Sequence, residues 1–347
     1  MKNFLARLAF LAAALLVGTN GWATAFSSMY SFGDSLSDAG SNPSAVLSIY
    51  KLLGNTCDPG HPCPPYVGGH YTNGPTAAEY LANAILPGGA NPANFHSFAV
   101  SGATTGIGNF GDGGTATSPG LFGLPAMAQE IGLYLSLSGG VADPNALYFV
   151  WGGANDFLTL DSPINAAQNV ANYVGALAGI GATHILVPNL PDLGLTPFVQ
   201  GAGLVPQAHA FSLGFNITLA GLLDNLGALF PATDIIQFDT FSFFNDVVAN
   251  PGQFGFTNAQ DACLLTPSCV PGQFVFWDDF HPTTQADAVI AAAFAKSVPE
   301  PHSILLVGLG LLMLAALNTQ GRRSASIARL IDRAASSPSG SPTHRRP

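Results

Sequence analysis

The feature that most constrains the fold of this chain is the alternation of short apolar runs with longer segments rich in Ala and Leu. The short runs predict five strands, at 27–32, 93–100, 146–153, 183–190 and 234–239. The longer segments predict five helices, at 76–84, 124–137, 164–180, 207–230 and 284–296. Strands separated by helices indicate a parallel sheet with both faces covered, and nearly continuous apolar strands suit such burial. We therefore predict an α/β fold with a mainly parallel five-stranded sheet.

The first 25 residues predict a secretory signal peptide. Lys2 and Arg7 precede the short apolar run "LAFLAAALLVG", and Ala23-Thr24-Ala25 provides a small-residue cleavage site. A membrane helix is the alternative, but the apolar run is short for one. We expect cleavage after Ala25 and export of the remaining chain to the cell envelope or the medium.

A second apolar segment lies near the C-terminus. Val298-Pro299-Glu300-Pro301 precedes an apolar run from Ile304 to Leu317, and Arg322-Arg323 follows it. One interpretation is a membrane anchor with its basic flank inside, although the run is shorter than the roughly 20 residues of a usual span. The pattern resembles a PEP-CTERM sorting signal, which implies processing by an exosortase. Residues 298–323 are therefore predicted to be the only part of the chain that contacts a membrane. Residues 324–347 are predicted to be a disordered tail, although PEP-CTERM signals usually end without such a tail.

The remaining residues, 26–297, are predicted to form one strongly acidic domain. They contain 18 acidic and 2 basic residues, which gives a formal charge of −16. Such a surface repels phosphate backbones, so a nucleic-acid partner is not expected. The charge suits a soluble body outside the cell. The sequence has no internal repeat and no linker within this range, which favours a single domain.

The four cysteines form two closely spaced pairs, Cys57 with Cys63 and Cys263 with Cys269. In an exported protein two local disulfides are the simplest interpretation. A zinc site is the alternative, because His61 lies between the first two cysteines. No histidine lies between the second two, however, and thiolates are hard to keep reduced outside the cell. We expect two disulfides and no metal.

Small and polar residues follow the first three predicted strands. Gly33-Asp34-Ser35 follows the first, Ser101-Gly102-Ala103 the second, and Gly153-Ala154-Asn155-Asp156 the third. Ligands of open parallel sheets bind beyond the carboxyl ends of the strands. These three segments therefore predict a reaction site at one edge of the sheet.

The candidate nucleophile of this site is Ser35. A serine hydroxyl needs a base to take its proton, and a histidine base needs a carboxylate to fix its tautomer. The stretch "FWDDFHPTTQA" offers His281 with Asp278 three residues before it, and Asp279 is the alternative partner. Because the base must be neutral, activity should fall in acid and level off on the alkaline side. We expect Thr284 to cap the helix that follows.

The negative charge that develops on an attacked carbonyl oxygen also needs donors. The backbone amides of Ser35 and Gly102 are candidates, since a glycine lets the reacting group approach the main chain closely. The side-chain amide of Asn155 is a third donor. Each such donor contributes about 3 kcal/mol to lowering a barrier of this kind. The chemistry requires no cofactor.

Four blocks of the sequence resemble the GDSL lipase/esterase family, a branch of the SGNH hydrolases. These blocks are "FGDSLSD", "FAVSGATT", "WGGANDF" and "FWDDFHPT", and they occur in the family's order and spacing across 28–295. Further stretches, such as "ILVPNLPDLGLTP", are similar to its plant-like subgroup. The resemblance implies a three-layer α/β/α sandwich of flavodoxin-like type, Ser35 as nucleophile, and oxyanion donors from Ser35, Gly102 and Asn155. It also implies His281 as base, with Asp278 as its partner.

Other polar residues are interpreted as structural. Asp34 is expected to stabilise the turn, Asp38 to cap a following helix, and Asp156 to fix its loop by hydrogen bonding. Histidines outside the blocks, including His61, are expected at the surface or the core edge. The stretch "GIGNFG" at 106–111 fits a dinucleotide motif formally, but no helix follows it, so we interpret it as a mobile loop near the site.

Three functions are compatible with these residues. The first is a secreted serine ester hydrolase acting on a small-molecule or lipid ester. The second is an acyltransferase that uses the same acyl-enzyme, because acceptor choice depends on how dry the pocket is. The third is a non-catalytic surface or matrix protein on this scaffold. The loops at 41–70 and 104–123 contain few large apolar residues, which argues against a deep tunnel for long acyl chains.

Overall fold

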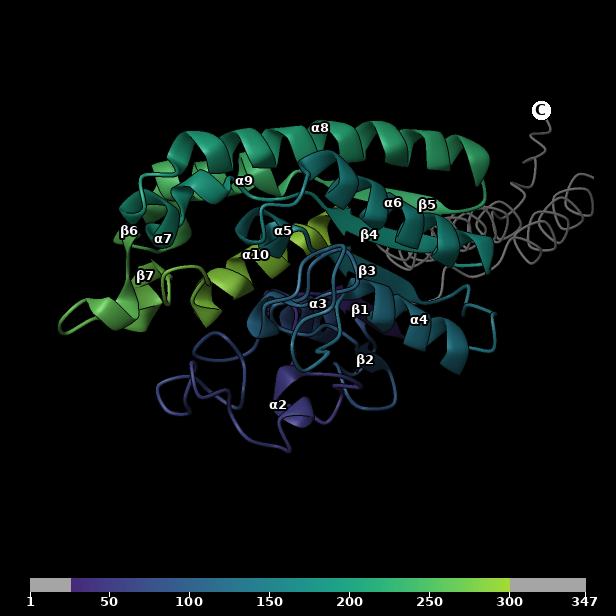
Figure 1. Cartoon of the computed structure of the whole chain (residues 1–347). Coiled ribbons are helices and arrows are strands. Elements are labelled where there is room, and N and C mark those ends of the chain that lie inside the picture. Colours follow the sequence, from purple (N-terminus) through teal and green to yellow (C-terminus); the bar gives the residue numbers. More distant parts are fainter. Residues whose placement is uncertain (1–25, 300–347) are drawn as a thin grey trace, which may run out of the picture. The chain divides into compact units, whose positions relative to one another are not determined.

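The computed structural model describes residues 26–299 of the 347-residue chain, and its centre is a five-stranded sheet (Figure 1). The strands are β1 (Met29–Gly33), β2 (Phe95–Ser97), β3 (Leu147–Trp151), β4 (His184–Pro188) and β5 (Asp234–Phe238). They pair in the order β2-β1-β3-β4-β5, and every pairing is parallel. Four lie within the predicted apolar runs and β1 ends one residue beyond its run, at Gly33. The strand order is the flavodoxin-like one. The predicted fold class is confirmed.

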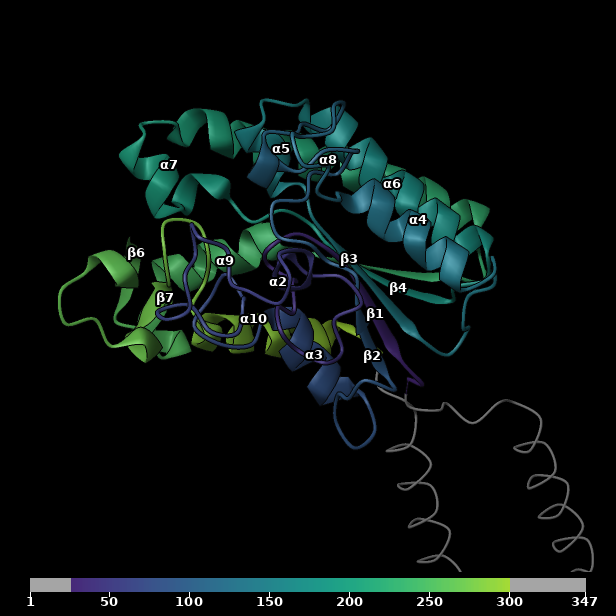
Figure 2. The same cartoon turned by 60° about the horizontal axis from the view of Figure 1, so that its bottom comes forward.

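Helices cover both faces of this sheet (Figures 1 and 2). One face carries α4 (Met127–Leu137), α6 (Pro163–Gly179) and α8 (Val205–Leu229), and the other carries α3 (Ala77–Ile85), α9 (Thr240–Ala249) and α10 (Thr284–Ser297). Alternate residues of the fully buried strand β3 divide between the two layers. Tyr148 and Val150 pack with the first set of helices, whereas Leu147, Phe149 and Trp151 pack with the second. The predicted three-layer sandwich is therefore confirmed.

The pattern did not predict α9 or the shorter elements around the sheet. These are the helices α2 (Ile49–Leu52), α5 (Ala154–Leu158) and α7 (Pro197–Gly201), and the two-stranded sheet of β6 (Asn258–Ala262) and β7 (Phe274–Phe276). The structure also has 3-10 turns η1 (Phe110–Asp112), η2 (Leu193–Leu195), η3 (Pro251–Phe254), η4 (Cys263–Leu265) and η5 (Pro271–Gln273). The shorter elements carry too few residues for a periodicity to emerge. Length does not explain the miss of α9, which has ten residues against nine in the predicted helix α3.

Two further predictions, the disulfides and the cap of the last helix, can be compared with the structure. Both predicted disulfides are present, with Cα atoms 5.9 Å apart for Cys57–Cys63 and 5.4 Å apart for Cys263–Cys269. The cap of α10 is Thr283, whose side chain accepts the Ala286 amide, so the prediction that Thr284 caps this helix was wrong by one residue.

The predicted signal peptide and nearly all of the predicted sorting segment and tail lie outside the described residues. Across 26–299, no helix is both long enough and apolar enough to cross a bilayer.

The end of β1 is fixed by one buried carboxyl group. Glu130, on α4, is fully buried, and its two oxygens accept the amides of Gly33 at 2.8 Å and Val100 at 3.1 Å. Gly33 has a φ of +151°, and a Cβ there would collide with the Trp151 carbonyl on β3. These contacts therefore fix the direction in which the chain leaves β1, two residues before Ser35.

We predict that Glu130→Ala lowers the free energy of unfolding by roughly 2–6 kcal/mol, because it leaves two buried amides without an acceptor. Glu130→Gln retains one acceptor oxygen and should cost clearly less. Urea unfolding monitored by circular dichroism measures both values. Equal stability of the Ala variant and the wild type would show that the two amides do not depend on this side chain.

Candidate active site

The five predicted site residues come together at the carboxyl ends of the strands. Ser35, Gly102 and Asn155 follow β1, β2 and β3, whereas Asp278 and His281 lie on the loop between β7 and α10. The Ser35 Oγ lies 2.8 Å from His281 Nε2. The other ring nitrogen, Nδ1, lies 2.8 Å from Asp278 Oδ2. A serine, an imidazole and a carboxylate thus form one continuous hydrogen-bonded chain.

Asp278 is the carboxylate in contact with His281. One of its oxygens also accepts the amides of Phe280 at 2.9 Å and His281 at 2.7 Å, and the other accepts the Tyr66 hydroxyl at 2.8 Å. Burial raises the pKa of Asp278, but the His281 charge and the hydrogen bonds from His281 and Phe280 outweigh it and lower the pKa to about 2. Asp278 is therefore ionised wherever the protein is folded near neutral pH. Asp279 bonds through its backbone carbonyl to Phe198 instead.

The ionised state of Asp278 decides the histidine tautomer. A carboxylate can only accept hydrogen bonds, so the proton of a neutral His281 resides on Nδ1. Nε2 is then an acceptor, and it faces the Ser35 hydroxyl at 2.8 Å. This geometry allows the ring to take the serine proton directly.

Three donors lie beside the serine. Within the described residues, the amides of Ser35 and Gly102 donate to no protein acceptor. Gly102 has a φ of +82°, and a Cβ there would collide with the Asn109 side chain, so the position requires glycine. The Asn155 amide nitrogen donates one hydrogen to the Ala103 carbonyl at 2.9 Å and has a second hydrogen to offer. All three residues line the same cavity.

Buried carboxyl groups hold the loops that carry these donors. Asp38 accepts the amide and hydroxyl of Ser101 at 2.8 and 2.9 Å, which ties the loop after β1 to the loop after β2. Asp156 accepts the amide and hydroxyl of Thr105 at 2.9 and 2.6 Å, as predicted for a loop-fixing residue. Asp34 accepts the Leu36 amide within its turn, also as predicted. The cap of the next helix, α2, is Ser48, although Asp38 does accept the first helical amide.

Two of these carboxyl groups have strongly raised pKa values. Burial raises the pKa of Asp34 to about 6, against the opposing effects of the Leu36 amide and the His281 charge. Burial likewise raises the pKa of Asp156 to about 7, although Thr105 stabilises its ionised form. Both groups are nearly inaccessible to solvent. Their protonation is therefore coupled to folding in the neutral range.

The loop at 41–70 was expected to border the acyl site, but no individual residue at 57–71 was predicted to contact the site residues. Tyr66 donates to Asp278, and His61 and Tyr71 line the cavity with Asp58. His61 is 28% exposed, as expected for a residue at the core edge, but the sequence did not indicate that it lines the cavity. No motif marks this loop, and its one signal is the disulfide that closes it at Cys57 and Cys63.

The cavity around Ser35 has a volume of about 740 Å³ and mainly apolar walls. The loops at 41–70 and 104–123 contribute Ile49, Leu53, Phe110 and Phe122. Most of the apolar wall comes from other elements, and includes Trp151, Phe157, Val199, Phe244, Phe276 and Ile290. The two loops thus contribute few of the large apolar residues, as expected, and the absence of a deep tunnel for long acyl chains stays a prediction. Gly111 and Phe110 place the "GIGNFG" loop beside the site, as predicted.

The fold is an α/β sandwich that carries a serine–histidine–carboxylate chain at the carboxyl ends of its strands, and the family can be named. The family model of the GDSL-like lipase/acylhydrolases matches residues 29–294, so the chain belongs to that family.

Among its relatives, Esterase EstA of Pseudomonas aeruginosa is 30% identical over 335 residues, which cover 86% of this chain and 50% of EstA. A GDSL esterase/lipase of Arabidopsis thaliana is 27% identical over 329 residues, which cover 78% of this chain and 91% of that protein. The chain thus spans about half the length of the Pseudomonas relatives it matches. With relatives in both bacteria and plants, the plant-like subgroup stays a prediction.

Among solved structures, a lipolytic G-D-S-L family protein from Veillonella parvula superposes with a TM-score of 0.39 at 13% identity, over 78% of this chain and 94% of that one.

We predict that Tyr66→Phe lowers kcat/KM for ester cleavage by about three- to tenfold, because Asp278 loses the hydroxyl that holds one of its oxygens. The loss should lie mainly in kcat, because Tyr66 contacts Asp278 and does not line the cavity in which the ester would bind. Tyr50→Phe is the matched control, as the Tyr50 hydroxyl bonds to no other described residue. Identical steady-state kinetics for Tyr66→Phe and the wild type would mean that the phenol does not orient Asp278.

We also predict that stability falls as pH rises from about 4 to 8, because burial raises the pKa of Asp34 to about 6 and that of Asp156 to about 7. The pKa of Asp34 is raised on folding from 3.8 to about 6, so its favourable contribution is complete below the unfolded value and is lost as pH rises through the folded one. A shift of this size corresponds to about 3 kcal/mol. Asp34→Asn should flatten the pH dependence between about pH 4 and 6, as measured by urea unfolding. A wild-type curve that rises over this range would contradict the account.

Proposed function

We propose that this protein is an exported serine hydrolase that cleaves carboxylic esters through an acyl-enzyme on Ser35. The observation that carries the proposal is the continuous hydrogen-bonded chain of Ser35, His281 and Asp278, with 2.8 Å at both links, at the wall of an apolar cavity. Membership of the GDSL-like lipase/acylhydrolase family supports it, as do relatives named as esterases.

In the first half of the proposed reaction, His281 Nε2 takes the proton of Ser35 as Oγ attacks the ester carbonyl. Asp278 stabilises the resulting imidazolium and remains ionised itself, which agrees with its lowered pKa. The negative charge on the former carbonyl oxygen is received by the amides of Ser35 and Gly102 and by the Asn155 side chain. Preorganised donors in an apolar site stabilise such charge more strongly than water does.

In the second half, the imidazolium returns its proton to the departing alkoxide, which leaves as the alcohol. Water then enters, His281 takes one of its protons, and the hydroxide attacks the acyl-enzyme. Collapse of this intermediate releases the carboxylic acid and restores the Ser35 hydroxyl. Interception by an alcohol in place of water is the acyltransferase alternative, which the transfer-to-hydrolysis ratio would reveal.

The apolar cavity supports an acyl group with substantial hydrocarbon surface. Its volume of about 740 Å³ lies within the range of small-molecule sites and accommodates more than an acetyl group. Burial of each additional methylene of the acyl chain contributes about 0.8 kcal/mol where the wall can cover it. We therefore propose medium-length acyl esters as substrates.

We propose export on separate grounds. The two disulfides of the described domain fit an oxidising compartment, and so does its acidic composition. The signal peptide at 1–25 would direct export, and the PEP-CTERM-like segment at 298–323 would then be processed by an exosortase. Mass spectrometry of the native protein would give both of its mature ends.

We predict that Ser35→Ala abolishes hydrolysis of p-nitrophenyl butyrate, with a loss in kcat of about 10⁴-fold or more. The matched control is Ser37→Ala in the same turn, because the Ser37 hydroxyl is buried and contacts no polar partner. Circular dichroism and thermal unfolding should show that both variants fold. Turnover by folded Ser35→Ala at the wild-type rate would refute the proposed function.

A further inference from the structure

A second histidine–carboxylate pair lies in the wall of the same cavity. His61 Nδ1 is 2.9 Å from Asp58 Oδ2, and the Tyr71 hydroxyl donates to the same oxygen at 2.7 Å. Asp58, His61 and Tyr71 all line the cavity. The first two lie inside the seven-residue loop that the Cys57–Cys63 disulfide closes, and this closure limits how far the pair can move.

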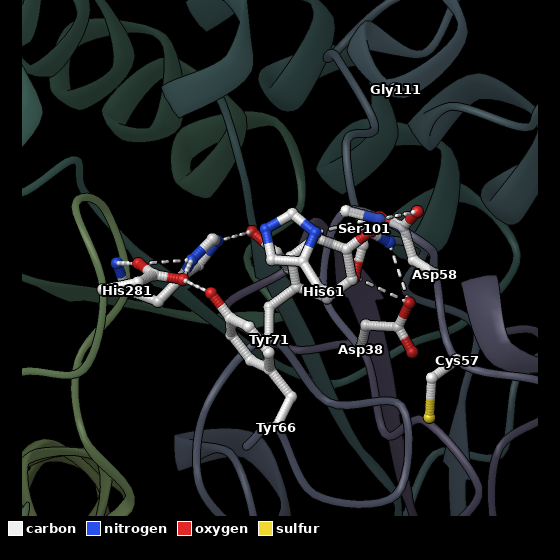
Figure 3. A network of polar contacts seen from close by, with 12 residues as sticks. Asp38, Cys57, Asp58, His61, Tyr66, Tyr71, Ser101, Gly111 and His281 are labelled. Atoms are coloured by element: carbon white, nitrogen blue, oxygen red, sulfur yellow. Dashed lines mark hydrogen bonds and ion pairs between the residues drawn. The ribbon is translucent and has the colours of Figure 1, made fainter. Parts of the chain in front are cut away.

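This pair lies next to the candidate base. The ring centroids of His61 and His281 are 6.2 Å apart, and the Tyr71 ring lies 4.0 Å from His61 and 5.4 Å from His281. Figure 3 shows the His61 imidazole between Asp58 and His281. A group bound at His281 on the cavity side therefore also lies close to His61 and Tyr71.

The hydrogen bonds of Asp58 decide what His61 offers to a ligand. Three donors converge on the Asp58 carboxylate: His61, Tyr71 and the Gly60 amide. The His61 hydrogen bond in particular keeps the Asp58 pKa well below its usual range. Asp58 is therefore an acceptor, and a neutral His61 carries its proton on Nδ1. Its Nε2 is then an unoccupied acceptor, since that atom bonds to no described residue.

The reaction chemistry fixes which half of an ester reaches this acceptor. The imidazolium of His281 must return its proton to the departing alkoxide, so the ester's alcohol oxygen lies at His281 Nε2. The carbonyl oxygen points instead to Gly102 and Asn155. Substituents on the alcohol carbon next to the ester oxygen are therefore the ones that can reach His61.

We propose that His61, oriented by Asp58, binds a hydroxyl group on the alcohol portion of the substrate, so that the enzyme favours esters of polyols over esters of simple alkyl alcohols. This inference rests on the proposed ester hydrolysis and adds the identity of the leaving group. A hydroxyl fits the site because it donates to the bare Nε2 of a neutral His61. The neighbouring Tyr71 ring provides an apolar face against which the carbon that carries this hydroxyl can pack.

A purely structural role accounts for only part of this arrangement. Asp58 is the hydrogen-bond partner of one His61 nitrogen, and the rings of Tyr66 and Tyr71 pack against the imidazole. They leave the second nitrogen without a partner in a side chain that is 28% exposed. In a buried histidine of this chain, His70, both nitrogens lie against acceptors: Nδ1 is 2.7 Å from the Val67 carbonyl, and Nε2 is 2.9 Å from Glu79 Oε2.

The test compares two esters of equal size, propyl butyrate and 2-hydroxyethyl butyrate, which differ by a methyl group in place of a hydroxyl. For each protein the quantity measured is the ratio of kcat/KM for the hydroxyl ester to kcat/KM for the alkyl ester. We expect His61→Ala to lower this ratio about fivefold relative to the full-length wild type, the effect of losing one hydrogen bond. Asp58→Asn should lower it in the same direction, and the loss should appear mainly as a higher KM for the hydroxyl ester.

His96→Gln is the control, since His96 stacks on Tyr30 and does not line the cavity, and it should retain the wild-type ratio. An unchanged ratio in both His61→Ala and Asp58→Asn would overturn the inference. Equal losses on the two esters would also overturn it, because His61 would then act on the common chemistry or on the fold. Absence of turnover of either ester by the wild type would overturn the proposed function as well, so the two failures are distinguishable.

Discussion

The hydrogen bond between Ser35 and His281 joins segments 246 residues apart, and the rest of the site depends on it. Loop-closure entropy opposes such a long-range contact, so both ends must be held by other interactions. Ser35 follows directly from β1, where Glu130 and the close approach of Trp151 fix the chain. His281 is held by Asp278 and by a short turn that ends at the Thr283 cap of α10.

The loops of the site are joined by buried carboxyl groups more than by ion pairs with basic residues. Asp38 connects the loops after β1 and β2, and Asp156 connects α5 to the loop at Thr105. Backbone amides and hydroxyls are their partners, which agrees with a domain that contains only two basic residues across 26–297. This arrangement buries acidic groups, and burial makes their ionised forms less favourable. The pKa values of Asp34 and Asp156 are raised for this reason.

The sheet and the five site residues could be predicted because their signals are local. Buried parallel strands are continuously apolar, and the segments around Ser35, Gly102, Asn155 and His281 carry short motifs at strand or helix ends. The cavity wall could not be predicted in this way, since Trp151, Phe244 and Ile290 meet only through tertiary packing. The same holds for Tyr66 and His61. Their loop has no periodicity, and its position is set by one disulfide and by a hydrogen bond to Asp278, 212 residues away.

The central claim is that Ser35 is a nucleophile activated by His281, and covalent labelling tests it most directly. The full-length protein would be incubated with an organophosphonate p-nitrophenyl ester, digested, and analysed by mass spectrometry. The account predicts a single phosphonyl adduct on the peptide that contains Ser35, formed much more slowly in His281→Ala. An adduct at another residue, or labelling of Ser35 at the same rate without His281, would contradict it.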